Sequence, residues 1–188
     1  RLVYEGFDPD DEGLREALCT LGNGYIATRG AAPESRADGV HYPATYAAGV
    51  FNRLSDRFDG RVLTNESIVN LPNWLPLAVR GPAGWFDDRE AQIVSHHVEL
   101  DPQRAVLVRR TTFADPDGRH LRLAQRRLVS LRDPHLAALE TTIVAEGWDG
   151  PVTVRSAIDG GVRNAGVPRY ADLSGRHLLQ HLPPDRAE

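Results

Sequence analysis

Apolar and polar residues alternate along much of the chain from Tyr25 onward, in short segments that glycine, proline and aspartate separate. Such alternation places every second side chain on the same face of a β-strand. It predicts strands over nine segments, namely residues 25–29, 44–51, 62–69, 74–80, 91–98, 104–114, 119–131, 136–146 and 151–158. Strands of this number and spacing are typical of a β-sandwich or a β-barrel.

Three turn signals set the order of the later strands. The strongest lies at residues 115–118 (DPDG), and residues 132–135 and 147–150 supply two more. In the strand after the first turn, four apolar side chains fall on one face: Leu121, Leu123, Val129 and Leu131. We therefore expect the last four strands to form an antiparallel meander.

A short helix is predicted over residues 14–18, and an acidic turn at residues 8–13 precedes it. Acidic side chains ahead of a helix interact favourably with the positive end of its dipole. The predicted fold is therefore mainly β, an antiparallel β-sandwich with one or two short helices.

The composition is that of a globular protein, with 188 residues of which 41% are hydrophobic and 26% charged. This length predicts one domain, or at most a domain and a half. The net charge of −4 argues against a nucleic-acid partner, and no apolar stretch has the length of a membrane span. Cys19 is the single cysteine, which favours a reducing compartment, and we expect a cytoplasmic protein.

The sequence contains no methionine and begins with Arg1. A translation product begins with methionine, so we expect this chain to be part of a longer polypeptide.

Several residues are candidates for nucleotide, metal or catalytic sites. Residues 22–24 (GNG) with Gly30 have the wrong spacing for a nucleotide loop, and a strand pattern follows them, which favours a structural turn. His96 and His97 are neighbours in a strand pattern, so their rings point to opposite faces and cannot share a metal. Cys19 has no activating residues beside it in sequence. Residues 87–88 (DD) favour a solvated loop over a catalytic carboxylate pair.

Trp74 lies beside Asn70 and Asn73, and aromatic rings next to amides are typical of sugar sites. A tryptophan in a β-sandwich is more often a core residue, because it is a large apolar group with one polar atom. From the residues alone, the chain is a β-rich domain without a visible active site.

Five segments, in order, resemble motifs of glycoside hydrolase family 65, which contains maltose, trehalose and kojibiose phosphorylases and acid trehalases. The most specific is residues 20–30 (TLGNGYIATRG), which is similar to the family's LGNGYxGxRG stretch. The others are residues 45–51, 69–75, 127–136 and 158–164. Matching motif residues with an expected structural role are Gly22, Asn23, Gly24, Arg29, Gly30, Asp159, Gly160 and Asn164.

The resemblance implies that residues 1–188 form an N-terminal β-sandwich of the large, galactose-mutarotase-like kind, itself incomplete. In full-length members a helical linker and an (α/α)6 barrel follow, and the barrel carries the general acid and the phosphate site. That barrel is absent from this chain. The resemblance therefore implies no catalytic residue here, and we expect the isolated domain to be inactive.

The implied function is that of the non-catalytic domain of an inverting α-glucoside phosphorylase or hydrolase acting on a disaccharide such as trehalose or maltose. The domain would support its own barrel and contribute to a homodimer, and Asn70, Asn73 and Trp74 would lie at the sugar pocket or the barrel contact. No cofactor or metal is expected. Inorganic phosphate would be the co-substrate of a phosphorylase.

Two alternatives come from other classes of protein. One is a stand-alone carbohydrate-binding β-sandwich. The other is an aldose mutarotase-like enzyme, which would need His96 or His97 to share a groove with Glu99 or Glu140.

Overall fold

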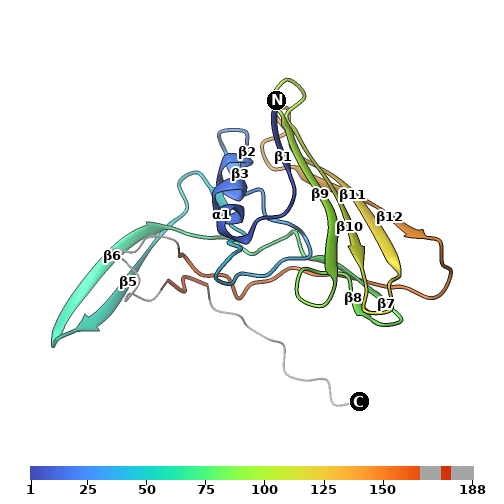
Figure 1. Cartoon of the computed structure of the whole chain (residues 1–188). Coiled ribbons are helices and arrows are strands. Elements are labelled where there is room, and N and C mark those ends of the chain that lie inside the picture. Colours follow the sequence, from blue (N-terminus) through green and yellow to red (C-terminus); the bar gives the residue numbers. More distant parts are fainter. Residues whose placement is uncertain (166–174, 179–188) are drawn as a thin grey trace, which may run out of the picture.

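One large antiparallel sheet dominates the computed structural model, which describes residues 1–165 and 175–178 (Figure 1). Its strands lie in the order β1-β9-β10-β11-β12. Their bounds are Leu2–Glu5 (β1), Gln92–Asp101 (β9), Val106–Ala114 (β10), His120–Val129 (β11) and Ala137–Glu146 (β12). The four long strands follow one another along the chain, so the predicted sheet is confirmed in its central part.

A second layer of shorter elements covers one face of this sheet. It contains one helix, α1 (Pro9–Leu18), and two three-stranded sheets. The first small sheet contains β2 (Leu21–Gly22), β3 (Ile26–Thr28) and β4 (Thr45–Ala47), and the second contains β7 (Leu77–Gly81), β8 (Gly84–Trp85) and β13 (Thr153–Ser156). The mainly β, antiparallel sandwich predicted from the sequence is confirmed.

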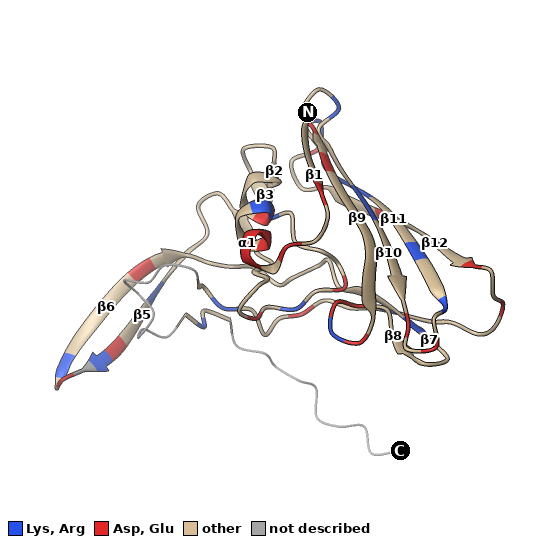
Figure 2. Ribbon diagram, in the orientation of Figure 1, with Lys and Arg blue, Asp and Glu red and all other residues tan. Residues whose placement is uncertain are grey.

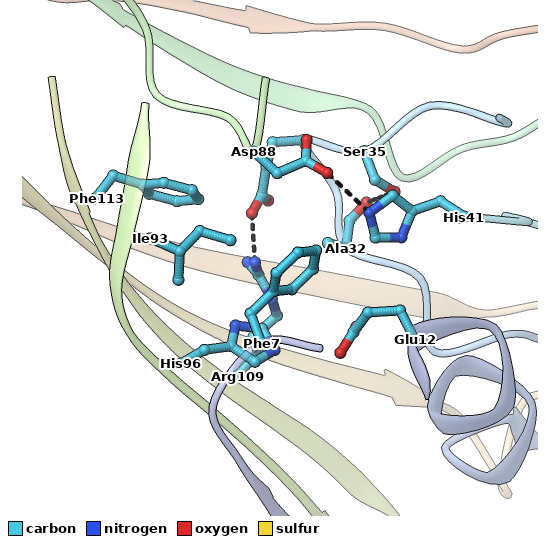
Figure 3. Close-up of a pocket in the computed structure, with 11 residues that line it drawn as sticks. Phe7, Glu12, Ala32, Ser35, His41, Asp88, Ile93, His96, Arg109 and Phe113 are labelled. Carbon is cyan, nitrogen blue, oxygen red and sulfur yellow. Dashed lines mark hydrogen bonds and ion pairs between the residues drawn. The ribbon is translucent and has the colours of Figure 1, made fainter. Parts of the chain in front are cut away.

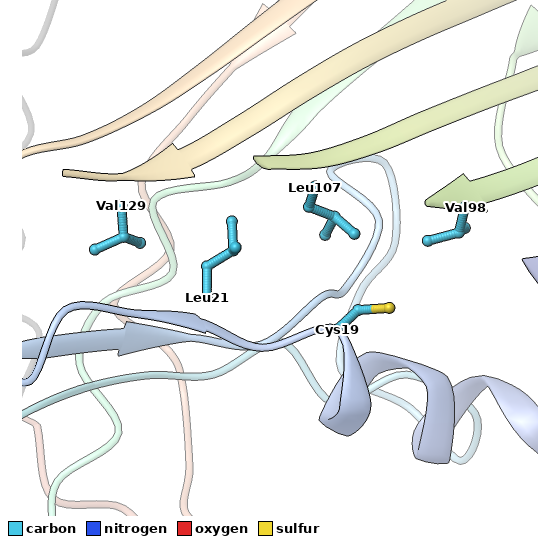
Figure 4. Close-up of a cluster of buried hydrophobic side chains, with 5 residues drawn as sticks. All are labelled: Cys19, Leu21, Val98, Leu107 and Val129. Atoms are coloured by element: carbon cyan, nitrogen blue, oxygen red, sulfur yellow. The ribbon is translucent and has the colours of Figure 1, made fainter. Parts of the chain in front are cut away.

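Two hydrophobic clusters join the layers at opposite ends of the large sheet. In the first, Cys19 and Leu21 pack against residues of β9, β10 and β11 (Figure 4). In the second, Val79 and Phe86 pack against Phe113 and two leucines of β11. Leu121, Leu123 and Val129 share the buried face as predicted, but Leu131 is 74% exposed because it lies in the turn after β11.

The third predicted return of the meander is wrong. β13 does not pair with β12 but crosses to the second layer, where Val154 lies opposite Val79 of β7. Residues 147–150 do turn the chain, as their turn signal predicts. A turn signal indicates where the chain bends, but it does not indicate which strand the chain pairs with next. Trp148 fills the corner, where its indole N–H donates to the His120 carbonyl over 2.7 Å.

The helix begins five residues earlier than predicted. Asp8 caps it by accepting a hydrogen bond from the Asp10 N–H, and Pro9 occupies the first turn, where its missing N–H is not needed. The acidic residues therefore belong to the first turn of the helix, where they interact with its dipole. No helix in the described part of the chain is long and apolar enough to cross a membrane.

A two-stranded hairpin of β5 (Phe51–Phe58) and β6 (Arg61–Ile68) projects from the rest of the molecule as an arm (Figure 1). Only its second strand was predicted, because the alternation ending at residue 51 was assigned to a single strand. Gly49 has a φ of 79° and turns the chain between β4 and β5. Asp59 and Gly60, with φ of 47° and 74°, form the tip, as expected for a two-residue turn with left-handed backbone.

The core predicts a large cost for Phe113→Ala. Phe113 is fully buried in the second cluster, so its loss leaves a cavity and should lower the free energy of unfolding by roughly 3–5 kcal/mol. Urea unfolding of the chain measures this value. Leu131→Ala is the matched control, with a change of about 0.5 kcal/mol or less, and equal effects of the two substitutions would contradict the assignment of the core.

Candidate functional site

Asn70 and Asn73 lie in the interior of the fold. The side chain of Asn70 is only 2% exposed. Its Oδ1 accepts from the Thr45 N–H over 3.1 Å, and its Nδ2 donates to the Arg163 carbonyl over 3.1 Å. Both ends of the amide are therefore engaged by the backbone.

Asn164 completes this arrangement from the other end of the sequence. Its Oδ1 accepts from the Asn70 N–H over 2.9 Å, and its Nδ2 donates to the Ile68 carbonyl over 2.6 Å. Asn73 forms an isolated antiparallel bridge with Asp159. We call Asn70, Asn73, Asp159 and Asn164 the amide clasp, because together they fasten residues 68–73 to residues 159–164.

Asp159 and Gly160 form the turn at one end of the clasp, in which the Asp159 carboxylate accepts from the Gly161 N–H over 2.7 Å. Trp74 is half-buried next to the clasp. The three residues suggested for a sugar pocket, Asn70, Asn73 and Trp74, are thus close together, but the two amides already have partners within the domain. A contact of this region with a barrel or a sugar stays a prediction.

The segment containing Gly22, Asn23 and Gly24 is a turn between β2 and β3. Gly24 has a φ of 85°, and the Asn23 Oδ1 accepts from two backbone N–H groups across the turn. The Asn23 Nδ2 donates to the Ser130 carbonyl over 2.7 Å, more than a hundred residues away. This turn therefore fastens the first small sheet to the end of β11, and no helix N-terminus follows it to hold a phosphate.

Arg29 and Gly30 join the small sheet to the helix. The Arg29 guanidinium donates to the Gly13 carbonyl over 2.8 Å and to the Tyr42 carbonyl over 2.9 Å. A Cβ on Gly30 would lie 2.7 Å from the Cβ of Cys19, a separation that side chains cannot adopt. Glycine is required here by close packing rather than by a ligand.

A line of buried polar residues separates the two hydrophobic clusters. The sequence pattern does not predict this line. We call it the polar seam. From the large sheet it contains His96, Arg109, Thr111, Gln125 and Arg127, and from the covering layer Glu12, Glu16, Glu34 and His41. Figure 3 shows part of it around Arg109, His96 and His41, with the contact between His41 and Asp88 dashed.

Arg109 is the central cation of the seam. Its Nη2 lies 2.5 Å from Glu34 Oε1 in an ion contact, and its Nη1 donates to Gln125 Oε1 over 3.0 Å. Neither Glu34 oxygen accepts an aligned hydrogen bond within the described residues. Arg127 donates to the carbonyls of Arg29 and Ala31, so the loop after β3 is held against the sheet by two arginines.

His41 is a buried cation between two carboxylates. Its Nδ1 donates to Glu16 over 2.8 Å and its Nε2 to Asp88 over 3.0 Å. Burial by itself would lower the pKa of His41, but the hydrogen bonds and charges of Asp88 and Glu16 outweigh it and raise the pKa to about 10. The imidazolium thereby joins α1 to the segment before β9.

His96 takes the opposite charge state a short distance away. Burial, and after it the positive charge of Arg109, lower the pKa of His96 to about 3, so the ring is neutral near pH 7. Its Nδ1 lies 2.9 Å from Thr111 Oγ1. A bulge between Thr112 and Phe113 of β10 shifts the register of β9, which lets both Ile93 and His96 face inward.

The acidic residues at positions 87–88 do not lie in a solvated loop, which corrects the expectation from the sequence. Asp87 is buried and contacts Arg89, and Asp88 binds His41. The charge of Asp87 is neutralised by Arg89, which is close in sequence, and that of Asp88 by His41, which is remote in sequence. The cavity along this part of the seam measures about 10 Å³, which has room for roughly one water molecule and not for a sugar ring.

The opposite, outer face of the large sheet carries a shallow groove of about 550 Å³. Val106 and Val108 line it together with Glu99, Arg126 and Glu140. His97 lies on this face, 3.7 Å from Glu99 and 2.7 Å from Glu5, whereas His96 lies on the buried one. The two rings do point to opposite faces, and a histidine and a carboxylate do share the outer face, although His97 contacts Glu5 and Glu140 is ion-paired with Arg126.

In the part of the chain that the structure describes, Cys19 and the candidate metal ligands are not arranged for chemistry. Cys19 is buried, and burial followed by the charge of Glu12 raises the pKa of its thiol to about 11, so the thiolate form is scarce. No group of three or more His, Cys, Asp or Glu side chains among residues 1–165 and 175–178 is arranged to hold a metal ion.

The seam predicts a strong dependence of each buried charge on its partner. Arg109→Met leaves the Glu34 carboxylate buried without its cation and should lower the free energy of unfolding by about 3–5 kcal/mol. The double substitution Arg109→Met with Glu34→Leu removes both charges and should recover most of that loss. Urea unfolding of the single and double variants measures the difference, and a double variant less stable than the single one would refute the pairing.

His41 predicts a loss of stability as the pH rises. Its pKa is about 10 in the folded state and near 6.5 when unfolded, so its stabilising contribution is complete below pH ~6.5 and disappears as the pH approaches 10. Unfolding free energies between pH 6.5 and 10 should fall for the natural chain. They should fall less for His41→Asn, and parallel profiles for the two proteins would contradict the charged state.

The profile described as "Glycosyl hydrolase family 65, N-terminal domain" matches residues 2–187. An uncharacterized glycosyl hydrolase of Mycobacterium tuberculosis is 48% identical over 178 residues, which are 94% of this chain and 13% of that protein.

Two relatives with named activities are phosphorylases. The trehalose 6-phosphate phosphorylase of Lactococcus lactis is 33% identical over 92% of this chain and 22% of its own length. The kojibiose phosphorylase of Halothermothrix orenii is 30% identical over 87% of this chain and 20% of its own length. The chain therefore spans between about an eighth and about a fifth of the length of these relatives.

The fold has a counterpart among solved structures. A candidate kojibiose phosphorylase from the human microbiome superposes with a TM-score of 0.75 and 19% identity, over 85% of this chain and 21% of that one. The motifs, the sandwich and the family profile agree: the chain belongs to glycosyl hydrolase family 65, as an N-terminal domain.

Proposed function

We propose that this chain is the non-catalytic N-terminal domain of an inverting phosphorylase or hydrolase that acts on an α-linked glucose disaccharide. The observation that carries the proposal is the match of nearly the whole chain to a small N-terminal fraction of much longer phosphorylases. The chemistry would then be done by a helical barrel elsewhere in the polypeptide. Inorganic phosphate would be the second substrate if the enzyme is a phosphorylase.

The state of the ionisable groups supports a non-catalytic role. An inverting hydrolase needs an acid and a base on opposite sides of the sugar, separated widely enough to admit a water, and in an inverting phosphorylase phosphate takes the place of the base-activated water. The buried carboxylates of the seam instead neutralise arginine and histidine within the fold, and the adjoining cavity is too small for a sugar. Their function is to hold the two layers together.

The amide clasp supports a role in positioning the region around Trp74. Because Asn70, Asn73 and Asn164 bind backbone atoms on both sides, the loop before β7 is held in one conformation. A rigid loop with a half-buried tryptophan is suited to contact a barrel or to wall its pocket. In the same proposal, the domain also contributes to a homodimer of the enzyme.

Activity measurements on two proteins test this proposal. The full-length polypeptide should release glucose 1-phosphate or glucose from trehalose, kojibiose, maltose or trehalose 6-phosphate, in the presence of inorganic phosphate for the first product. The 188-residue chain should release neither. Turnover by the short chain, or none by the long one with any of these sugars, would refute the proposal.

Calorimetric titration separates this proposal from a stand-alone sugar-binding domain. The 188-residue chain should give no heat with millimolar glucose, maltose or trehalose, because the clasp amides already have partners. Saturable heat that disappears in a folded Trp74→Ala variant would instead favour carbohydrate binding by the domain itself.

A further inference from the structure

The β5–β6 arm, residues 51–68, is the part of the domain with the least support from its surroundings. β5 and β6 pair with each other over eight residues and form a sheet of their own. In Figure 1 the arm extends away from α1 and from the large sheet. A two-stranded hairpin is marginally stable in water unless a third strand or another surface packs on it.

Apolar side chains are exposed on both faces of this arm. One face presents Phe51 opposite Ile68 near the base and Val62 near the tip, and Val62 is 60% exposed. The other face presents Leu54 and, diagonal to it, the exposed Leu63. Exposed apolar residues clustered on an open hairpin are typical of an interaction surface.

Polar pairs between these residues keep the arm soluble and in register. Arg53 forms an ion pair with Glu66 across the strands, and Ser55 bonds Thr64 over 2.9 Å. Charged residues surround the tip, where the ribbon in Figure 2 carries the colours of basic and acidic residues next to each other. These cross-strand pairs set which residues face each other, although exposed pairs of this kind contribute little stability.

The base of the arm is held firmly, so the direction of the arm is defined by the fold. The Val69 N–H donates to the Val50 carbonyl over 3.0 Å, and Asn164 of the clasp donates to the Ile68 carbonyl. The clasp thus connects the arm to the segment 159–165. An arm fixed at its base, with Val62 and Leu63 exposed near its tip, is preorganised for a partner.

We propose that the arm docks into a cleft of the same polypeptide's catalytic portion, with both of its faces covered. The proposal rests on the proposed function, in which this domain is one part of a longer enzyme. The relatives are between about four and eight times as long as the matched region, so most of their surface lies outside it. A second copy of the arm stacked face to face would cover either Val62 or Leu63 and leave the other exposed, whereas a cleft covers both.

Photo-cross-linking of the full-length polypeptide tests the docking. A photoreactive benzoylphenylalanine is placed at position 62 in one variant and at position 63 in another, and the products are mapped by mass spectrometry. Both variants should give intrachain links to residues C-terminal to this domain. Position 131 is the control, because Leu131 is at least as open to solvent but lies in the turn after β11 and not on the arm, and it should give no such link.

The other outcomes overturn the proposal. A covalent dimer on a denaturing gel would show that a second copy covers the arm. Links to residues 1–165 alone, an absence of links, or links from only one of the two faces would exclude a cleft. Leu63→Asp adds a second measurement, since it should lower the melting temperature of the full-length protein and leave that of the 188-residue chain unchanged.

The activity assay on the same preparation keeps the two proposals separate. Cross-links to the C-terminal portion without any phosphorolysis or hydrolysis would refute the proposed reaction and leave the docking intact. Turnover without those links would refute the docking alone.

Discussion

The ion contact between Arg109 and Glu34 is the constraint on which the rest of the structure depends. Both groups are buried between two hydrophobic clusters, where an unpaired charge would cost several kcal/mol. The sheet therefore requires the loop after β3 to bring its carboxylate to one place. Arg127 adds hydrogen bonds to two carbonyls of the same loop. The loop after β3 is therefore held against the sheet by a charge contact and hydrogen bonds, because it has no strand pairing there.

The same requirement determines which way the helix faces. α1 turns Glu12 and Glu16 inward and leaves Leu14 and Leu18 exposed, the reverse of an ordinary amphipathic helix. Glu16 reaches His41, which stays protonated, while His96 stays neutral beside Arg109. Burial lowers the pKa of both rings, but at His41 two carboxylates outweigh it, whereas at His96 the charge of Arg109 adds to it.

Sequence periodicity predicted the part of the fold whose stability comes from alternating apolar residues. The strands β9 to β12 are of this kind, and so is the hairpin at residues 115–118. It could not predict that β13 joins β7, because partner choice depends on packing between layers. Nor could it place Arg109, Gln125 and Arg127 on the buried face, since charged residues in a strand pattern normally indicate the exposed one.

The candidate site, like the fold, could be predicted only in part from the sequence. Motif residues such as Asn23, Asn70 and Asn164 were found from their resemblance to a family, yet their hydrogen bonds reach carbonyls about a hundred residues away. No spacing rule within a short window contains that information. The first strand of the arm was not predicted because polar residues on both faces hide the period of β5, and the register shift between β9 and β10 breaks the alternation along β9.

The amide clasp also sets an order for the making of the protein. A ribosome delivers the chain from its N-terminus, and Asn70 emerges some ninety residues before Asn164, its partner in the clasp. During that interval the backbone N–H of Asn70 and the carbonyl of Ile68 lack the partners that Asn164 provides. Long-range contacts of this kind form late and slowly. The nascent domain therefore cannot complete the hydrogen bonds of Ile68 and Asn70 until Asn164 has been synthesised.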